Sequence, residues 1–236
     1  MNNRERLSTE DQWNAFFEKD GQWETNQGTE QTRLFAEAFC KHTRIKTLES
    51  GQSLLDSSCA LGDALPVFKN HFPKARLFGC DFSGTAINRC KAKFSGMASF
   101  FQASMEEIPG MYDVIYSSAT LEHFVDYGEK VRSLLQRCKY LCIVVPYDEK
   151  RFGNDLEYCH DYDHVATFRE HSFDFLLDER LAKKIHCPKV FPVPKAWSWT
   201  LTERIIQNAK NIIRLMIKKP ILRDRQMILY EIERAD

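Results

Sequence analysis

Five short apolar runs follow one another through the first 145 residues, and segments with helical spacing separate most of them. The runs span residues 53–56, 76–80, 98–102, 112–116 and 140–145. Apolar side chains at helical spacing lie between them at 65–71, 86–94 and 131–135. Strands that alternate with helices predict α/β units around a mainly parallel sheet. Ligands of such sheets bind beyond the carboxyl ends of the strands, so the turns after the first four runs are where we expect function.

The chain divides into two predicted parts. Residues 1–48 are predicted to form an N-terminal helical cap, and residues 49–236 a single main domain. After Pro146 the alternation stops, and residues 147–175 are expected to be loop-like. Residues 197–219 predict an amphipathic helix within an inserted arm of about 197–225, and residues 226–233 predict a final strand.

Composition excludes several classes of protein. The 236 residues include 33 basic and 33 acidic side chains, so no overall charge attracts nucleic acid, and no nucleic-acid partner is expected. A hydrophobic fraction of 43% excludes a disordered chain. Neither a membrane-spanning run nor the apolar segment of a signal peptide is visible. The eight cysteines, with no C-x-x-C pair, are therefore expected to be reduced and mostly buried in a cytoplasmic protein.

The turn after the first run is rich in small residues. A dinucleotide fingerprint needs glycines at i, i+2 and i+5, and Ser58, Ala60 and Asp63 stand there instead, which disfavours a nicotinamide-dependent reductase. The pattern acid-x-small-x-small-x-Gly does fit, from Asp56 through Ser58 and Ala60 to Gly62. The alternative is an ordinary strand-to-helix turn in which Asp63 caps the next helix.

The turn after the second run carries another acid, Asp81. A carboxylate at the end of a strand accepts hydrogen bonds from both hydroxyls of a ribose. The alternative is that Asp81 caps the helix that follows.

Four segments together resemble class I S-adenosylmethionine (SAM)-dependent methyltransferases. The first turn is similar to the family's D-x-G-x-G-x-G, with Ser58 and Ala60 in place of two glycines. Residues 81–87 resemble D-x-S-x-x-A-I, and residues 112–123 resemble F-D-V-V-x-S-x-x-L-E-H. Residues 102–109 are similar to G-D-A-x-x-L-P, where Ser104 replaces the acid. The resemblance covers about residues 50–180.

The resemblance implies a fold and a cofactor. The fold is a Rossmann-like three-layer α/β sandwich: a seven-stranded, mainly parallel sheet with an antiparallel last strand, an N-terminal helical cap and a C-terminal helical insertion. The cofactor is SAM, whose methionine part lies against the small residues of the first turn. Arg33 or Gln31 meets its carboxylate, or else both lie on a solvated helix face. The implied cofactor-binding residues are Arg33, Asp56, Ser58, Ala60, Gly62, Asp81, Phe82, Ser104, Met105 and Ser117.

The resemblance also implies methyl transfer. We expect O-methylation of a small molecule, such as a sugar or a glycan- or lipid-linked precursor. A hydroxyl acceptor needs a base, for which His123 is the candidate, with His160 and His164 as alternatives. His123 could instead only fix the start of a helix. Residues 158–164 hold metal-ligand types, but they are better interpreted as a substrate-side loop, so no metal is expected.

Two features leave alternatives open. Ser58, Ala60 and Ser104 depart from the family pattern, which makes a non-catalytic SAM-fold binding or scaffold protein the second hypothesis. Residues 203–225 hold seven basic and two acidic side chains. The helix at 197–219 could contact an anionic membrane surface weakly, with Trp197 and Trp199 at the interface, or draw in a phosphorylated substrate. Packing of its apolar stripe on the sheet is the favoured alternative.

Overall fold

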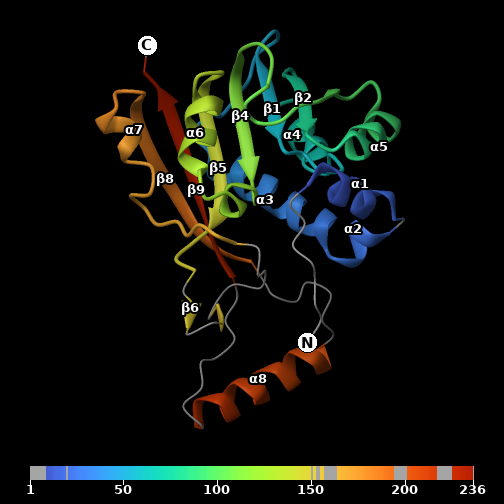
Figure 1. Ribbon diagram of the computed structural model, residues 1–236, viewed down its shortest axis with the longest axis vertical. Helices are drawn as coiled ribbons and strands as arrows, with labels where there is room; N and C mark the ends of the chain where they lie inside the picture. Colours follow the sequence, from blue (N-terminus) through green and yellow to red (C-terminus); the bar gives the residue numbers. More distant parts are fainter. Residues whose placement is uncertain are drawn as a thin grey trace.

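A seven-stranded sheet forms the centre of the protein, in the order β3-β2-β1-β4-β5-β9-β8 (Figure 1). The computed structural model describes residues 9–19, 21–149, 151–152, 155–156, 164–193, 201–216 and 225–235. The first five strands pair in parallel, and β9 lies antiparallel between β5 and β8. The predicted fold class is confirmed. The strands are β1 (Ser53–Ser57), β2 (Arg76–Asp81), β3 (Ser99–Gln102), β4 (Tyr112–Ser118), β5 (Cys138–Pro146), β8 (Ala182–Val193) and β9 (Arg225–Arg234).

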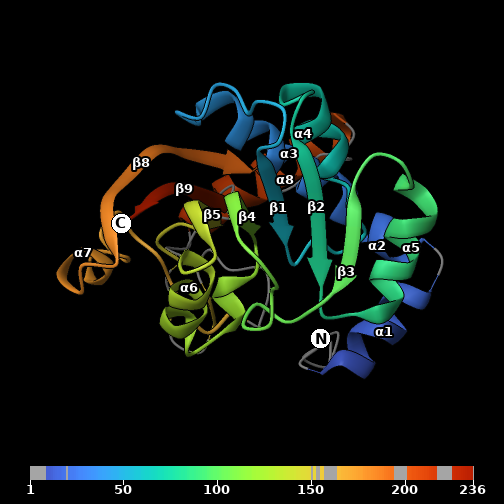
Figure 2. The ribbon, with the colours of Figure 1, turned by 90° about the horizontal axis from the view of Figure 1, so that it is seen from above.

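Helices cover both faces of the sheet and make it the middle of three layers (Figure 2). One face carries α3 (Gly28–His42), α4 (Leu65–His71) and α5 (Gly84–Phe94), and the other carries α6 (Tyr127–Leu135) and α7 (Phe175–Asp178). Successive strand side chains point to opposite faces, so Leu54 joins the core beside Phe68 of α4. Leu55 joins the other core beside Val131 of α6.

The N-terminal segment contains α1 (Glu10–Glu18) and α2 (Gln22–Thr25) before α3. A capping box of Thr9 and Gln12 begins α1, which packs against α5 beside the end of β2. The side chains of Phe35 and Phe39 in α3 are fully buried in the main core. The division into a cap and a main domain stays a prediction.

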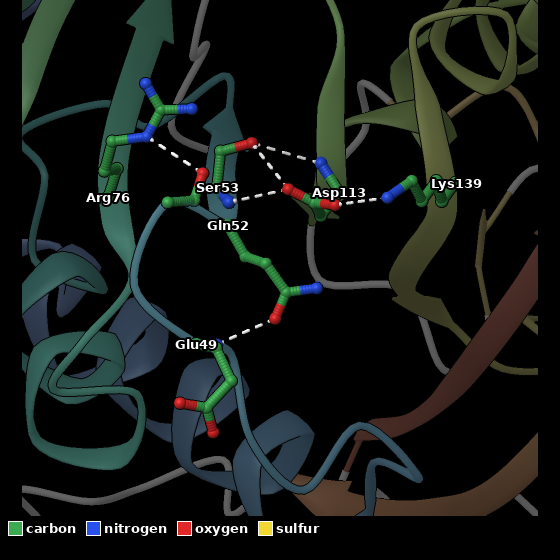
Figure 3. Close-up of polar contacts among 7 residues, drawn as sticks. Glu49, Gln52, Ser53, Arg76, Asp113 and Lys139 are labelled. Atoms are coloured by element: carbon green, nitrogen blue, oxygen red, sulfur yellow. Dashed lines mark hydrogen bonds and ion pairs between the residues drawn. The ribbon is translucent and has the colours of Figure 1, made fainter.

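The amino ends of β1, β2 and β4 are joined by polar contacts (Figure 3). Asp113 accepts hydrogen bonds from the Ser53 backbone N–H at 2.9 Å and from its hydroxyl at 3.2 Å, and it pairs with Lys139 at 2.7 Å. Burial opposes ionisation of Asp113, but the Lys139 ion pair and the Ser53 bonds together lower its pKa. These contacts hold together the amino ends of the strands, on the side of the sheet opposite the carboxyl ends.

The region after Pro146 contains more regular structure than the sequence predicts. A short hairpin pairs β6 (Arg151–Phe152) with β7 (Asp155–Leu156), and the long edge strand β8 follows α7. We did not predict β8, which contains Pro188 and Pro192 and shifts register twice along β9. Proline is tolerated at an edge because one side of an edge strand needs no hydrogen-bond donor.

Helix α8 (Leu201–Met216) stands between β8 and β9 in the sequence and apart from the sheet in Figure 1. The favoured expectation, that its apolar stripe packs on the sheet, is wrong for five of its large apolar side chains. These side chains are exposed, namely Ile205, Ile206, Ile212, Ile213 and Met216. Trp197 and Trp199 lie outside the described residues. Among the described helices, none has the length and apolarity that a membrane span requires.

Candidate active site

The turn after β1 holds three left-handed residues at alternate positions. Ser58, Ala60 and Gly62 have φ values of +61°, +47° and +75°. A Cβ atom at Gly62 would also lie 3.1 Å from the Cys90 sulfur and 3.2 Å from the Phe94 ring, so a side chain fits poorly there. Non-glycine residues in this conformation cost roughly 1–2 kcal/mol each. The pattern acid-x-small-x-small-x-Gly therefore coincides with backbone that glycine would adopt most easily.

Asp81 connects this turn to the next one. Its Oδ2 atom accepts the Ala60 N–H at 2.9 Å, and its Oδ1 atom accepts the Ser83 N–H at 2.9 Å. Burial raises the pKa of Asp81 to about 6, although both backbone hydrogen bonds oppose the shift. Each carboxylate oxygen has a second lone pair, so Asp81 retains acceptor capacity for a ligand hydroxyl.

Asp56 and Ser117 bring further buried polar atoms to the carboxyl ends of β1 and β4. Asp56 Oδ2 and Ser117 Oγ have no hydrogen-bond partner among the described residues. Burial, together with the charge of Asp81, raises the pKa of Asp56 well above its usual value. Two buried carboxyl groups whose ionised forms repel each other favour a cationic ligand with N–H or O–H donors.

The helix α5 begins in the second turn at Ser83, which is its N-cap. The Ser83 hydroxyl accepts the Ala86 N–H at 3.1 Å and donates to Asn14 Oδ1 at 2.6 Å. The alternative that Asp81 itself caps this helix is therefore wrong. Sequence reasoning missed Asn14, which also accepts the Thr85 N–H and joins α1 to this turn. The Thr9–Gln12 capping box marks the start of α1 in the sequence, but it gives no sign of the contact with Ser83.

The other predicted residues of the second and third turns lie in different surroundings. The Asp81 carbonyl accepts the Ala103 N–H at 3.1 Å, so the two turns are adjacent. Phe82 and Ser104 are half-buried, and the Ser104 hydroxyl donates to Glu107 at 2.9 Å. Met105 is buried in the core that also contains Leu55.

Arg33 borders a cavity. It lines an open cavity of about 710 Å³ between α3, α4 and α5, and no other predicted site residue lines that cavity. Asp63, which borders the same cavity, accepts hydrogen bonds from the Trp23 indole and the Thr29 hydroxyl and pairs with Lys93. The alternative role of Asp63 as a helix cap is therefore wrong, because Ala64 occupies the N-cap position of α4.

A cluster of acids and histidines follows β4. The short helix η1 (Leu121–His123) places the His123 ring at a centroid distance of 4.9 Å from the His164 ring, nearly perpendicular to it. His164 Nδ1 lies 2.7 Å from Glu149 Oε2 and Nε2 lies 4.0 Å from Glu122 Oε1. Nδ1 is therefore hydrogen-bonded to Glu149, and Nε2 faces η1. Backbone bonds from residues 165 and 166 to the Glu122 carbonyl hold the two segments together.

This cluster also offers metal-ligand types. One ligand atom each from Glu122, His123 and His164 lies within 4.8 Å of the others, and imidazole with carboxylate suits a divalent transition metal. His160 and residues 158–163 of the predicted ligand stretch lie outside the described residues. Of that stretch, the structure therefore places only His164, which lies beside His123.

Seven cysteines lie among the described residues, and all seven are free thiols. Six of them are buried, as the sequence predicts.

The sheet order, the left-handed turn after β1 and the acid at the end of β2 agree with the resemblance to class I SAM-dependent methyltransferases. Residues 30–180, more than half of the chain, match a family model described as a methyltransferase domain, and the chain belongs to this family. The predicted family is confirmed.

Individual relatives are distant. The chain is 25% identical over 96 residues to a trans-aconitate 2-methyltransferase of Deinococcus radiodurans, an alignment that spans 39% of this chain and only 37% of that enzyme. Its fold resembles a chain from a Haloferax volcanii complex between the Trm112 methyltransferase activator and a methyltransferase. The TM-score is 0.67 and the identity 14%, and the match covers 95% of this chain and 98% of that chain. It also resembles the plantazolicin methyltransferase BpumL, solved with S-adenosylhomocysteine (SAH). The TM-score is 0.58, the identity is 17%, and the match covers 94% of this chain and 93% of that chain.

Proposed function

We propose that the protein binds SAM at the carboxyl ends of β1, β2 and β4 and methylates a hydroxyl of a small molecule, such as a sugar or a glycan- or lipid-linked precursor. The observation that carries the proposal is the bond from the left-handed Ala60 to Asp81, which joins the small-residue turn to the predicted ribose acceptor. The buried atoms Asp56 Oδ2 and Ser117 Oγ fit a cationic ligand that brings hydrogen-bond donors.

Residues of this chain then have separate roles in the proposal. Asp81 accepts from the ribose hydroxyls, the turn from Ser58 to Gly62 lies against the methionine part, and Ser104 accepts from the adenine. Phe82, Met105 and Ser117 are the remaining proposed cofactor contacts. SAM, when bound, supplies a methyl group already activated on its sulfonium. The protein therefore needs to align the acceptor and exclude water, which in favourable cases supplies roughly 7–11 kcal/mol.

His123 is the proposed base for the acceptor hydroxyl. It follows β4, next to β1 at the switch in strand order, and lies against His164, which Glu149 orients. His123→Ala is expected to lower turnover by about 100- to 10,000-fold and to leave SAH affinity nearly unchanged. His171→Ala is the matched control, because His171 is an exposed histidine, paired with Asp174, to which the proposal gives no role.

The experiment combines binding and turnover. SAH is expected to raise the melting temperature of the purified chain, because only the folded turns assemble the site. Formation of SAH from SAM with a pool of hydroxyl-bearing sugars and lipid-linked glycans, read by mass spectrometry, then tests transfer. No melting shift at millimolar SAH would refute the binding site. Binding without product from any acceptor would favour the scaffold hypothesis.

A carboxylic acid is the second candidate acceptor, since the name of the Deinococcus relative specifies trans-aconitate. A carboxylate is already ionised at neutral pH and needs no base. Transfer to a carboxylate in both wild type and His123→Ala would therefore replace the hydroxyl proposal with this one.

A further inference from the structure

Helix α8 presents an apolar face that the rest of the described chain leaves uncovered. Between 48% and 78% of each large side chain on this face is exposed, namely those of Ile205, Ile206, Ile212, Ile213 and Met216. In a protein of this size, isolated apolar side chains on the surface are ordinary, but a continuous stripe on one helix marks an interaction site. Positions 205, 206, 209, 212, 213 and 216 lie on one side of the helix, within about 120° of its circumference.

Positive charge is concentrated in the segment of the sequence that contains most of α8. Residues 203–225 carry a local net charge of +5, and the whole chain is neutral, so the remainder carries −5. Lys210 borders the apolar stripe, and the sequence positions of Arg204 and Arg214 fall on the opposite side of the helix. An anionic surface therefore attracts this arm and repels the body, which favours one orientation of the protein on that surface.

We propose that α8 binds the surface of an anionic lipid bilayer, with its apolar face inserted at the level of the acyl chains and its basic side chains against the headgroups. A helix with a large apolar face, low net hydrophobicity and a basic polar face lies in the plane of the membrane interface. A second copy of this chain fits the face less well, since docking would bring two arms of +5 together. The proposal needs no methyl transfer, but if the proposed function holds, it narrows the acceptor to one presented at a lipid surface.

The test is co-sedimentation of the full chain with vesicles, in the absence of SAM and acceptor. We expect binding to vesicles of phosphatidylcholine with a quarter phosphatidylglycerol, little binding to phosphatidylcholine alone, and weaker binding as salt shortens the Debye length. Lys210→Ala is expected to weaken binding about fivefold, and the double variant Ile205→Asp/Ile212→Asp by more than tenfold. Met111→Asp is the matched control. Met111 has a similar exposed fraction (56%), and it lies outside α8, just before the amino end of β4.

Several results would overturn the proposal. One is equal binding to neutral and anionic vesicles, and another is wild-type binding by both α8 variants. A third is a dimer in sedimentation velocity that the double variant abolishes while vesicle binding is absent, which would assign the face to a second copy. SAH affinity, measured on every variant, is expected to be unchanged. If the wild-type protein does not bind SAH, the proposed function is refuted and the vesicle result still stands.

Discussion

Asp81→Asn is the substitution that tests the cofactor site most directly. The carboxylate ends β2, is almost completely buried, and accepts the N–H groups of Ala60 and Ser83, both at 2.9 Å. Asparagine has nearly the same shape, but it presents only one acceptor oxygen and no charge. A charge-assisted hydrogen bond to a ribose hydroxyl contributes about 1.5–3 kcal/mol, so SAH affinity is expected to fall roughly 10- to 150-fold.

The stability of the unliganded protein is expected to change much less. Moving the pKa of Asp81 from 3.8 to about 6 costs its ionised form ~3 kcal/mol at neutral pH, a cost that the uncharged amide of the variant would not have. Against this, the amide NH₂ cannot accept from one of the two backbone N–H groups, which costs about 1–3 kcal/mol. The two contributions nearly cancel, so weakened binding would not be explained by unfolding.

The pH dependence gives a second measurement. Because burial raises the pKa of Asp81, the folded state binds its proton more tightly than the unfolded state. Stability from this group is therefore greatest below pH 4 and decreases as pH rises towards 6. Affinity for SAH changes with pH in the opposite direction. It is expected to rise between pH 5 and 7 with a midpoint near 6, because the ionised carboxylate is the stronger acceptor.

Isothermal titration with SAH at several pH values checks both effects. Asp113→Asn is the matched control. Asp113 also accepts a backbone N–H, from Ser53, but it lies at the amino ends of the strands, away from the proposed cofactor site (Figure 3). The control is expected to keep the wild-type dissociation constant and its pH dependence. An Asp81→Asn variant with wild-type affinity across this range would refute the placement of the ribose at Asp81.

Three further predictions concern the turn after β1 and the acceptor side. Ser58→Gly and Ala60→Gly are each expected to raise stability in thermal unfolding by about 1 kcal/mol, because both positions have positive φ, whereas Ala64→Gly at φ −76° should lower it. Gly62→Ala should lower the melting temperature, since its φ is +75° and a Cβ would crowd Cys90 and Phe94, and an unchanged melting temperature would contradict the turn geometry. EDTA should leave the transfer rate unchanged, because His123 acts as a base through its own lone pair. If EDTA abolishes the transfer rate and Zn²⁺ restores it, Glu122, His123 and His164 would instead be ligands of a metal ion.

The sequence predicted the sheet and the turns because both follow from local patterns. Apolar runs between helical segments located β1 to β5, and the spacing of small residues located the turn that the structure shows in left-handed conformation. The edge strand β8 was missed because its two prolines argue against a strand, and only its position beside β9 makes them acceptable.

Contacts between distant segments could not be predicted in the same way. The sequence singled out Asp81 and Ala60 separately, and only the folded chain shows that one accepts from the other across 21 residues. Asn14 beside Ser83, and Glu149 beside His164, carry no motif, because a hydrogen bond between remote segments has no period in the sequence. The amphipathic pattern of α8 was visible from the start, whereas the exposure of its apolar face depends on which surfaces of the core are already covered by other elements, and only the tertiary structure determines that.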